Sequence, residues 1–218
     1  REENNLLIKS SLTTLKAPLA QLKAKLQTNL PSNPQVAKPA LEAIAQLEGL
    51  LNKFTILSSL ESGSLRKLSQ SVDLNQLVSE ITGHYAHVLQ SKALTVKADI
   101  GRHQLNQDRL LLSFAVDSLL SNAIKYSPQG GQIIISSHKG RHGIEISVHD
   151  SGPGIDEAKQ AELFQPFSRA ENAAENFNRP GAGLSLYLDK LVMHYLGGQV
   201  GVDSKSGHGT SVSLVVPA

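Results

Sequence analysis

The side chains that could do chemistry in this 218-residue chain gather in four short motifs of its C-terminal half. In the first motif, SNAIKYSP, the residues Asn122, Lys125 and Tyr126 share one face of a predicted helix with Ser118, because residues three and four positions apart are neighbours on a helix. An amide oxygen suits Mg²⁺, a lysine ammonium can meet phosphate charge, and a tyrosine ring can lie near a sugar or base. Taken alone, this pattern fits an amphipathic helix with a polar outer edge at least as well.

The second motif, DSGPGI, joins an aspartate to two spaced glycines. Asp150 ends a predicted strand, where a buried carboxylate could accept a hydrogen bond from an adenine amino group. Such charge-assisted bonds contribute roughly 1.5–3 kcal/mol. Gly152 and Gly154 carry no side chain, so the backbone could approach a base closely. By itself this motif is also a plausible tight turn.

The third motif, GAGLSLYL, places two glycines before Leu184 at the start of a predicted helix. Gly181 and Gly183 would let the free amides of the first helical turn point at phosphate groups, which the helix dipole also attracts. The stretch 168–180 before them is irregular and rich in asparagine and alanine. We expect that it could close over the site as a lid.

The fourth motif, GHGTSVSL, is a predicted turn between two strands that contains Gly207, Gly209 and Thr210. On its own it indicates only a hairpin. Together and in this order, the four motifs supply what a protein needs to hold Mg-ATP without a P-loop. We therefore expect ATP and Mg²⁺ as cofactors.

In order and residue types, the four motifs resemble the N box and the three glycine boxes of the histidine kinases of two-component signalling. The heptapeptide LFQPFSR, which contains Phe164, Phe167 and Arg169, resembles the F box of that family. The resemblance covers the whole chain and implies that Asn122 binds Mg²⁺, that Asp150 reads adenine, and that cationic side chains neutralise phosphate. The ATP-binding residues that it implies are Asn122, Lys125, Tyr126, Asp150, Gly152, Gly154, Phe167, Arg169, Gly181, Gly183, Leu184, Gly209 and Thr210.

The N-terminal part of the sequence has the pattern of a helical hairpin. Its apolar residues recur at alternating spacings of four and three, on one stripe of a helix; they are Ile8, Leu12, Leu15, Leu19, Leu22 and Leu26. Pro18 should bend this helix, and a turn at 29–34 leads to a second amphipathic helix. Two helices alone cannot bury so broad a stripe, so we expect residues 1–60 to form a homodimer, a four-helix bundle. A hairpin packed on its own C-terminal domain is the alternative.

The remaining elements predict one helical layer on one sheet. The expected fold is α+β: a helical hairpin that dimerises, followed by an α/β sandwich of the histidine kinase, gyrase and chaperone type. The expected domains are the hairpin at 1–62, a linker at 63–73 and the ATP-binding domain at 74–218. The predicted elements of the last domain are a helix capped by Asp73 and running to about Ala93, a strand at 95–100, a helix at 107–126 with Leu110, Phe114, Leu119 and Leu120 facing inward, a strand hairpin at 132–150, helices at 156–164 and 183–196, and two terminal strands.

One box of the family is altered in this sequence. LTTLKAPL at 12–19 aligns with the family's His-Glu-Leu-Arg-Thr-Pro-Leu box. Thr13 then stands at the phosphoacceptor histidine, Thr14 at the neighbouring acidic residue, and Ala17 at the residue that would place a water for dephosphorylation. A threonine phosphate is a stable ester and a poor phosphoryl donor, and a threonine hydroxyl needs an adjacent base. Ser118 likewise stands where the family usually has a second asparagine.

These departures favour a degenerate sensor histidine kinase that binds Mg-ATP and signals through conformation and partners. Two other readings stay open. One is an active kinase that uses another acceptor or phosphorylates a partner in trans. The other is an ATPase of the gyrase or chaperone type, which would carry a glutamate where Ser118 stands. A response regulator or a partner kinase is the expected binding partner.

Composition argues against several other classes of protein. The net charge of +2 and the lack of a dense basic run do not support nucleic-acid binding. Zero cysteines exclude disulfides and thiolate metal sites, and no carboxylate completes the paired histidines into a metal site. No apolar run reaches the ~18 residues of a membrane span. The family resemblance implies the cytoplasmic portion of an inner-membrane sensor, anchored through segments absent from this sequence.

Overall fold

The chain forms two compact units, Arg1–Arg66 and Lys67–Ala218. The computed structural model describes residues 15–16, 18–28, 34–168 and 183–217. Within these ranges, no helix is both long and apolar enough to cross a membrane.

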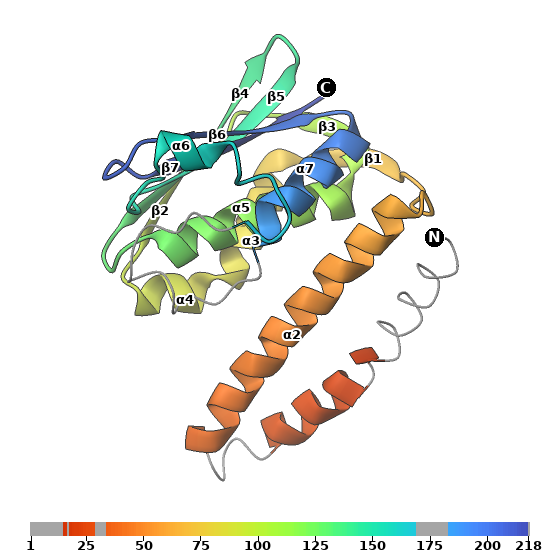
Figure 1. Ribbon diagram of the computed structural model, residues 1–218, viewed down its shortest axis with the longest axis vertical. Helices are drawn as coiled ribbons and strands as arrows, with labels where there is room; N and C mark the ends of the chain where they lie inside the picture. The colour runs from red at the N-terminus through yellow and green to blue at the C-terminus, as the bar shows by residue number, and fades with distance from the viewer. Residues whose placement is uncertain (1–14, 17, 29–33, 169–182, 218) are drawn as a thin grey trace. The chain divides into compact units, whose positions relative to one another are not determined.

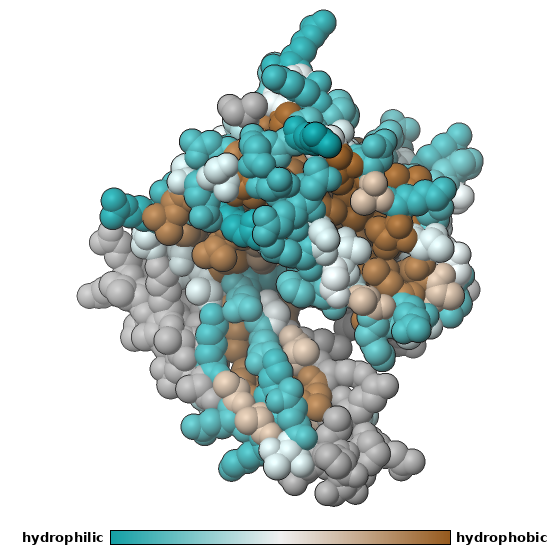
Figure 2. All heavy atoms as spheres, turned by 180° about the vertical axis from the view of Figure 1, so that it is seen from behind, coloured by the Kyte–Doolittle hydropathy of each residue, from teal (hydrophilic) through white to brown (hydrophobic). Residues whose placement is uncertain are grey.

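The first unit contains a helix at residues 18–28 and a longer helix, α2 (Pro34–Glu61). The Lys23 ammonium lies 2.7 Å from the Glu48 carboxylate and joins the two helices. Figure 2 shows hydrophobic side chains between hydrophilic ones on the visible face of this helix pair. The large apolar side chains that stay exposed are Leu15 at 51%, Leu22 at 49%, Leu47 at 49% and Phe54 at 37%. Helices therefore form in the described parts of both predicted segments, and these four apolar side chains are only partly buried within the chain. Ile8 and Leu12 of the predicted stripe lie outside the described residues.

The second unit is built on a five-stranded sheet. Its strands, in spatial order, are β2 (Thr95–Asp99), β4 (Gln132–Gly140), β5 (Gly143–Asp150), β7 (Thr210–Val216) and β6 (Gln199–Ser204). Only β2 and β4 are parallel, and every other neighbouring pair is antiparallel. Buried and less buried residues alternate along β5 and β7, as strands with one covered face require. The predicted hairpin between β4 and β5 is confirmed.

Two further strands form a small separate sheet that the sequence analysis did not predict. β1 (Ser69–Asp73) pairs antiparallel with β3 (Gln104–Asp108). The predicted helix at 107–126 accordingly begins later, as α5 (Arg109–Tyr126), because residues 104–108 are in the strand. The Asp108 carboxylate caps α5 and accepts from the backbone amides of its first turn.

The inward face of α5 was predicted only in part. Leu119 and Leu120 are buried, but Leu110 is 77% exposed and Phe114 is half-buried. Leu110 and Leu119 are nine residues apart, about two and a half helical turns, so they lie on opposite sides of the helix. The prediction that Leu110 faces inward is wrong for this reason.

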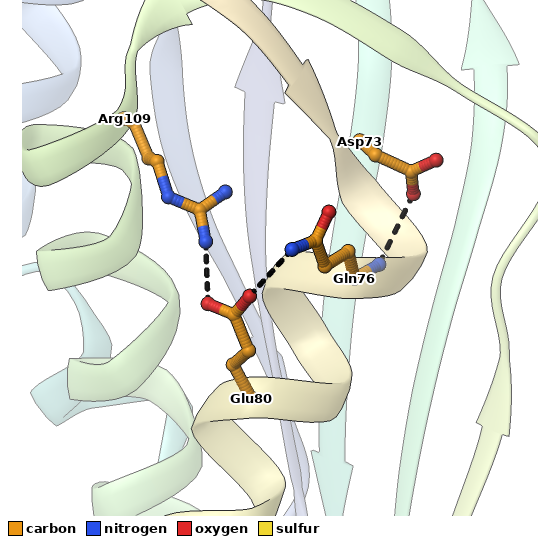
Figure 3. Close-up of polar contacts among 4 residues, drawn as sticks. All are labelled: Asp73, Gln76, Glu80 and Arg109. Carbon is orange, nitrogen blue, oxygen red and sulfur yellow. Dashed lines mark hydrogen bonds and ion pairs between the residues drawn. The ribbon is translucent and has the colours of Figure 1, made fainter.

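The helical layer begins with α3 (Leu74–His84), and Asp73 caps it as predicted by accepting from Gln76 N at 3.0 Å. Figure 3 shows the polar contacts that follow: the Gln76 amide donates to Glu80 at 2.8 Å, and Glu80 also binds the Arg109 guanidinium. The first residue of α5 is thereby tied to the middle of α3. The sequence analysis predicted one helix running to about Ala93. The structure has two helices instead: α3 ends at His84, and α4 (Ala86–Ser91) follows it after Tyr85.

In the second unit, α3, α4, α5 and α7 (Ser185–Leu196) lie on one side of the sheet, as Figure 1 shows. α5 packs on β5 and β7, and α7 packs on β6 and β7 and beside α5. One predicted element is shorter than expected, because α6 (Glu157–Gln160) gives way to turns before residue 164. The expected architecture of one helical layer on one sheet is confirmed.

Candidate functional site

The last turns of α5 carry the side chains of the first motif. Asn122, Lys125 and Tyr126 are all half-buried. Lys125 Nζ donates to the Tyr126 hydroxyl at 3.1 Å and lies 4.7 Å from the centre of its ring, a cation–π geometry. A residue outside α5 also binds this end of the helix. The Lys92 ammonium donates to the Ile124 carbonyl at 2.6 Å and so satisfies one of the last carbonyls of α5, which have no partner within the helix.

Asp150 ends β5 and is buried, with 5% of its surface exposed. Its carboxylate accepts from the backbone amide of Gly152 at 2.8 Å. Burial raises the pKa of the Asp150 carboxyl above its ordinary value of 3.8, while the Gly152 amide, nearby His149 and the Thr210 amide act in the opposite direction. The predicted burial of this carboxylate is confirmed, and its ionised form is held by two backbone donors.

The glycines of the second and fourth motifs let two loops approach each other. Gly154 has a φ of 69°, and a Cβ atom there would overlap the carbonyl oxygen of Lys205. Gly209 has a φ of 84°, and a Cβ atom there would overlap the carbonyl oxygen of Asp150. The sequence analysis assigned Gly154 to close approach of a base and Gly209 to a turn. In the structure both glycines contact the protein's own backbone, which fixes the loop after β5 against the loop before β7.

The start of α7 lies against the segment that resembles the F box. Gly183 has a φ of 67°, and a Cβ atom there would lie 2.6 Å from the carbonyl oxygen of Ser168. Leu184 is 2% exposed and provides no side-chain cap for the first amides of α7. Phe167 is 67% exposed and has a φ of 63°, an uncommon conformation for a bulky residue.

Four of the predicted site residues lie outside the described part of the chain. They are Thr13, Thr14, Arg169 and Gly181. The predicted lid at 168–180 also falls there, except for Ser168. Eight of the described predicted residues come together at two places: Asp150, Gly152, Gly154, Gly209 and Thr210 at the ends of β5 and β7, and Asn122, Lys125 and Tyr126 at the end of α5. Gly183, Leu184 and Phe167 lie at the start of α7.

These two places adjoin. A Cβ atom at Gly152 would lie 3.0 Å from the Tyr126 carbonyl oxygen, so the loop after β5 contacts the end of α5. The half-buried Asn122 amide can offer a hard oxygen to Mg²⁺, which commonly takes few protein ligands and keeps phosphates and waters as the others. Within the described residues, no group of three or more His, Cys, Asp or Glu side chains could hold a metal by itself.

Ser118, one helical turn before Asn122 on α5, is buried and hydrogen-bonded within the protein. Its hydroxyl donates to the carboxylate of Asp189 on α7 at 2.9 Å, and the two residues are 6% and 0% exposed. The sequence analysis placed Ser118 on the polar edge with Asn122, but its hydroxyl points into the contact between α5 and α7. Asp189 was missed, although a lone acidic residue within the apolar run LYLDKLVM could have indicated a buried polar contact.

Replacing Asp189 by alanine should destabilise the second unit by about 1–3 kcal/mol, because the Ser118 hydroxyl would lose its buried acceptor. Urea unfolding of the wild type, Asp189→Ala, Ser118→Ala and the double variant would measure the coupling between the two side chains. We expect the double variant to be less destabilised than the two single changes added together. Strictly additive effects would show that the contact contributes nothing to stability.

Comparison with known proteins also indicates an ATP-binding domain. The family model described as histidine kinase-, DNA gyrase B-, and HSP90-like ATPase matches residues 107–218, slightly more than half of the chain. The heme sensor protein HssS of Staphylococcus saprophyticus is 28% identical over 207 residues, which are 95% of this chain and 44% of that protein. The adaptive-response sensory kinase SasA of Microcystis aeruginosa is 34% identical over 147 residues, which are 66% of this chain and 38% of that protein.

Among solved structures, full-length ShkA in complex with AMPPNP matches with a TM-score of 0.78 at 18% identity, over 97% of this chain and 46% of that one. At this identity the likeness shows the fold alone. The chain spans less than half the length of these relatives. The matched domain binds ATP in its family, and the relatives are sensor proteins and sensory kinases. The chain therefore belongs to the histidine kinase-, DNA gyrase B- and HSP90-like ATPases.

Proposed function

We propose that this chain binds Mg-ATP and signals as a degenerate sensor histidine kinase, through conformation and partner contacts rather than through its own phosphoryl transfer. The observation that carries the proposal is a contrast within one chain. The loops around the buried Asp150 are closely packed and glycine-dependent, whereas threonine stands at the phosphoacceptor position. An ATP site without a phosphoacceptor histidine would suit a module that responds to nucleotide but transfers no phosphoryl group.

In the proposed complex, the Asp150 carboxylate accepts from the adenine amino group. Its two backbone donors already hold it in place, so little reorganisation is needed when the base arrives. Lys125 and Arg169 neutralise phosphate, and Tyr126 lies by the sugar or base. Lys125 would exchange its contact with the Tyr126 hydroxyl for a phosphate oxygen.

The remaining predicted residues form the rest of the proposed phosphate site. Asn122 would hold Mg²⁺ together with phosphate oxygens and water. Gly181, Gly183 and Leu184 would bring the first amides of α7 to the phosphates. The AMPPNP in the ShkA structure supports a nucleotide in this fold.

The loss of phosphoryl transfer is inferred from chemistry at three positions. Thr13 offers a hydroxyl in place of an imidazole, Thr14 offers no base to deprotonate it, and Ala17 cannot place a water. Relay to an aspartate in a response regulator needs a labile phosphoramidate, which an ester does not replace. All three substitutions therefore work against the phosphoryl-transfer chemistry of the family.

We further propose that residues 1–60 form the homodimer contact, in the cytoplasmic portion of an inner-membrane sensor, and that a response regulator or a partner kinase binds to it. Two observations support the dimer. Leu15, Leu22, Leu47 and Phe54 remain exposed on the helices. Leu15 and Leu22 both belong to the heptad stripe, which is a typical dimer seam.

An active kinase that uses another acceptor, or that phosphorylates a partner in trans, is the second candidate, because the ATP side of the chain is less altered than the hairpin. The gyrase or chaperone type of ATPase is less well supported. Its glutamate position is occupied by Ser118, whose hydroxyl is bound to Asp189 away from the motif's polar edge.

The test is incubation of the purified chain with γ-labelled ATP and Mg²⁺, with ATP binding measured in parallel by calorimetry. We expect binding without retained label. Acid-labile label would mean that a histidine elsewhere accepts phosphate, and the proposal would fall. Acid-stable label would support a threonine acceptor and the second candidate.

A double variant, Thr13→His with Thr14→Glu, restores the residue types of the family box. It should acquire acid-labile label, because an imidazole nucleophile and a neighbouring base are then both present. If it binds ATP and stays unlabelled, the block lies on the ATP side of the molecule rather than in the hairpin.

A further inference from the structure

The hydroxyl of Ser204, at the end of β6, joins the two loops that surround Asp150. Ser204 Oγ accepts from the backbone amide of Ile155 at 2.9 Å and lies 2.8 Å from the Gly209 carbonyl oxygen and 2.9 Å from Thr210 Oγ1. A serine hydroxyl donates once and accepts twice. Donation to Gly209 and acceptance from Ile155 and Thr210 therefore use its whole capacity.

A second side chain joins the same two loops. The Gln160 amide, at the end of α6, donates to the Ser204 carbonyl at 2.7 Å and to the Ile155 carbonyl at 3.2 Å. Ile155 thus has its amide bound to the Ser204 hydroxyl and its carbonyl bound to Gln160. The loops also meet directly, since Gly207 N donates to the Pro153 carbonyl at 2.6 Å.

These contacts reach the residues that hold the Asp150 carboxylate. Thr210 pairs with Asp150 in the β5–β7 ladder, and its backbone amide is one of the donors to the carboxylate. The other donor, Gly152, belongs to the loop whose far end is fixed at Ile155. Displacing either loop would therefore move a donor relative to the carboxylate.

Resting on the proposed function, we infer that Ser204, assisted by Gln160, is a positioning residue that holds Asp150 in the orientation that selects adenine over guanine. Adenine presents an amino donor where guanine presents a carbonyl acceptor. A fixed carboxylate distinguishes these two groups, because it accepts from the first and repels the second. A carboxylate on a loosened loop could turn away from the carbonyl and would discriminate less.

The experiment measures the affinities for ATP and GTP of the wild type and of Ser204→Ala by calorimetry. We expect the affinity for ATP to fall about tenfold, the size that a lost buried hydrogen bond commonly gives. The affinity for GTP should change much less, so the preference for ATP over GTP should also fall about tenfold. The matched control is Ser213→Ala, a half-buried serine on β7 outside both loops, which should keep the wild-type preference.

If Ser204 had only a structural role, Ser204→Ala would lower the melting temperature and reduce the affinities for ATP and GTP equally. An unchanged preference for ATP over GTP would therefore overturn the inference. If Ser204→Ala does not fold, Gln160→Met removes the second contact with little change in volume and should lower the preference in the same direction. A wild type that binds neither nucleotide would overturn the proposed function itself. A wild type that prefers ATP while both variants keep that preference would overturn only the role of Ser204 and Gln160.

Discussion

Asp150→Asn should bind ATP at least about tenfold more weakly than the wild type, on the scale of ~1.4 kcal/mol for each factor of ten. The substitution keeps the shape of the side chain but removes the charge that strengthens a hydrogen bond from the adenine amino group. An amide nitrogen facing that amino group would also place two donors together. Calorimetric titration with Mg-ATP measures the effect, and Asp203→Asn, an exposed aspartate on β6, is the matched control. An unchanged affinity in Asp150→Asn would contradict the assignment of adenine recognition to this residue.

The same variant should gain stability in the absence of nucleotide. Burial raises the pKa of the Asp150 carboxyl in the folded state above 3.8, so the folded protein binds this proton more tightly than the unfolded chain does. The resulting contribution to stability is fully present below pH 3.8 and is lost as the pH rises through the folded pKa. Asparagine has no such loss, so its advantage in urea unfolding should be larger at pH 7 than at pH 4. A wild type more stable than the variant at pH 7 would mean that the hydrogen bonds to the carboxylate outweigh its burial.

Affinity for ATP should follow the ionisation of the same group. Only the ionised carboxylate can accept from the adenine amino group at full strength, so binding to the wild type should weaken as the pH falls through the folded pKa of Asp150. Asp150→Asn should lack this part of the pH dependence. Protonation of the ATP phosphates affects the affinity of both proteins alike. The difference between the two pH profiles therefore gives the contribution of Asp150.

The parts of the fold that could be predicted are those with strong local signals. The hairpin of β4 and β5 has alternating apolar residues and a glycine-flanked turn, and Asp73 precedes an amphipathic run. The strands β1 and β3 have no such signal. Each is mostly polar, with Val72 and Leu105 as their fully buried apolar side chains, and they pair across more than thirty residues of sequence. Pairing over that separation leaves no local pattern.

The candidate site divides in the same way. The spacing of Asn122, Lys125 and Tyr126 was enough to place them on one face of a helix. The position of Asp150 at the end of a predicted strand was enough to indicate that its carboxylate is buried. Contacts between distant loops could not be read from spacing. Gly154 and Gly209 are needed because backbone from another segment approaches them, and Ser204 looks like any strand serine until its three partners are seen. Residues that position others are missed because their partners lie far away in the sequence.

Leu22→Lys should convert the proposed dimer into a monomer. Leu22 is 49% exposed in the single chain, and it lies on the heptad stripe with Leu15, one heptad earlier. Burying a leucine contributes about 1.5–3 kcal/mol, and a symmetric dimer loses this contribution twice while also bringing two ammonium groups toward an apolar seam. The dissociation constant should therefore rise by about a hundredfold or more.

Light scattering coupled to size-exclusion chromatography measures the expected fall from a dimeric to a monomeric mass. Gln21→Lys is the matched control, because it adds the same charge at the neighbouring exposed position of the same helix, off the apolar stripe. It should remain a dimer. A dimeric mass for Leu22→Lys would exclude this stripe as the seam, and a monomeric wild type would favour the alternative in which the hairpin packs within its own chain. Because Leu22 lies in the first unit and the ATP-binding residues lie in the second, the monomeric variant should still bind ATP, which separates dimerisation from nucleotide binding.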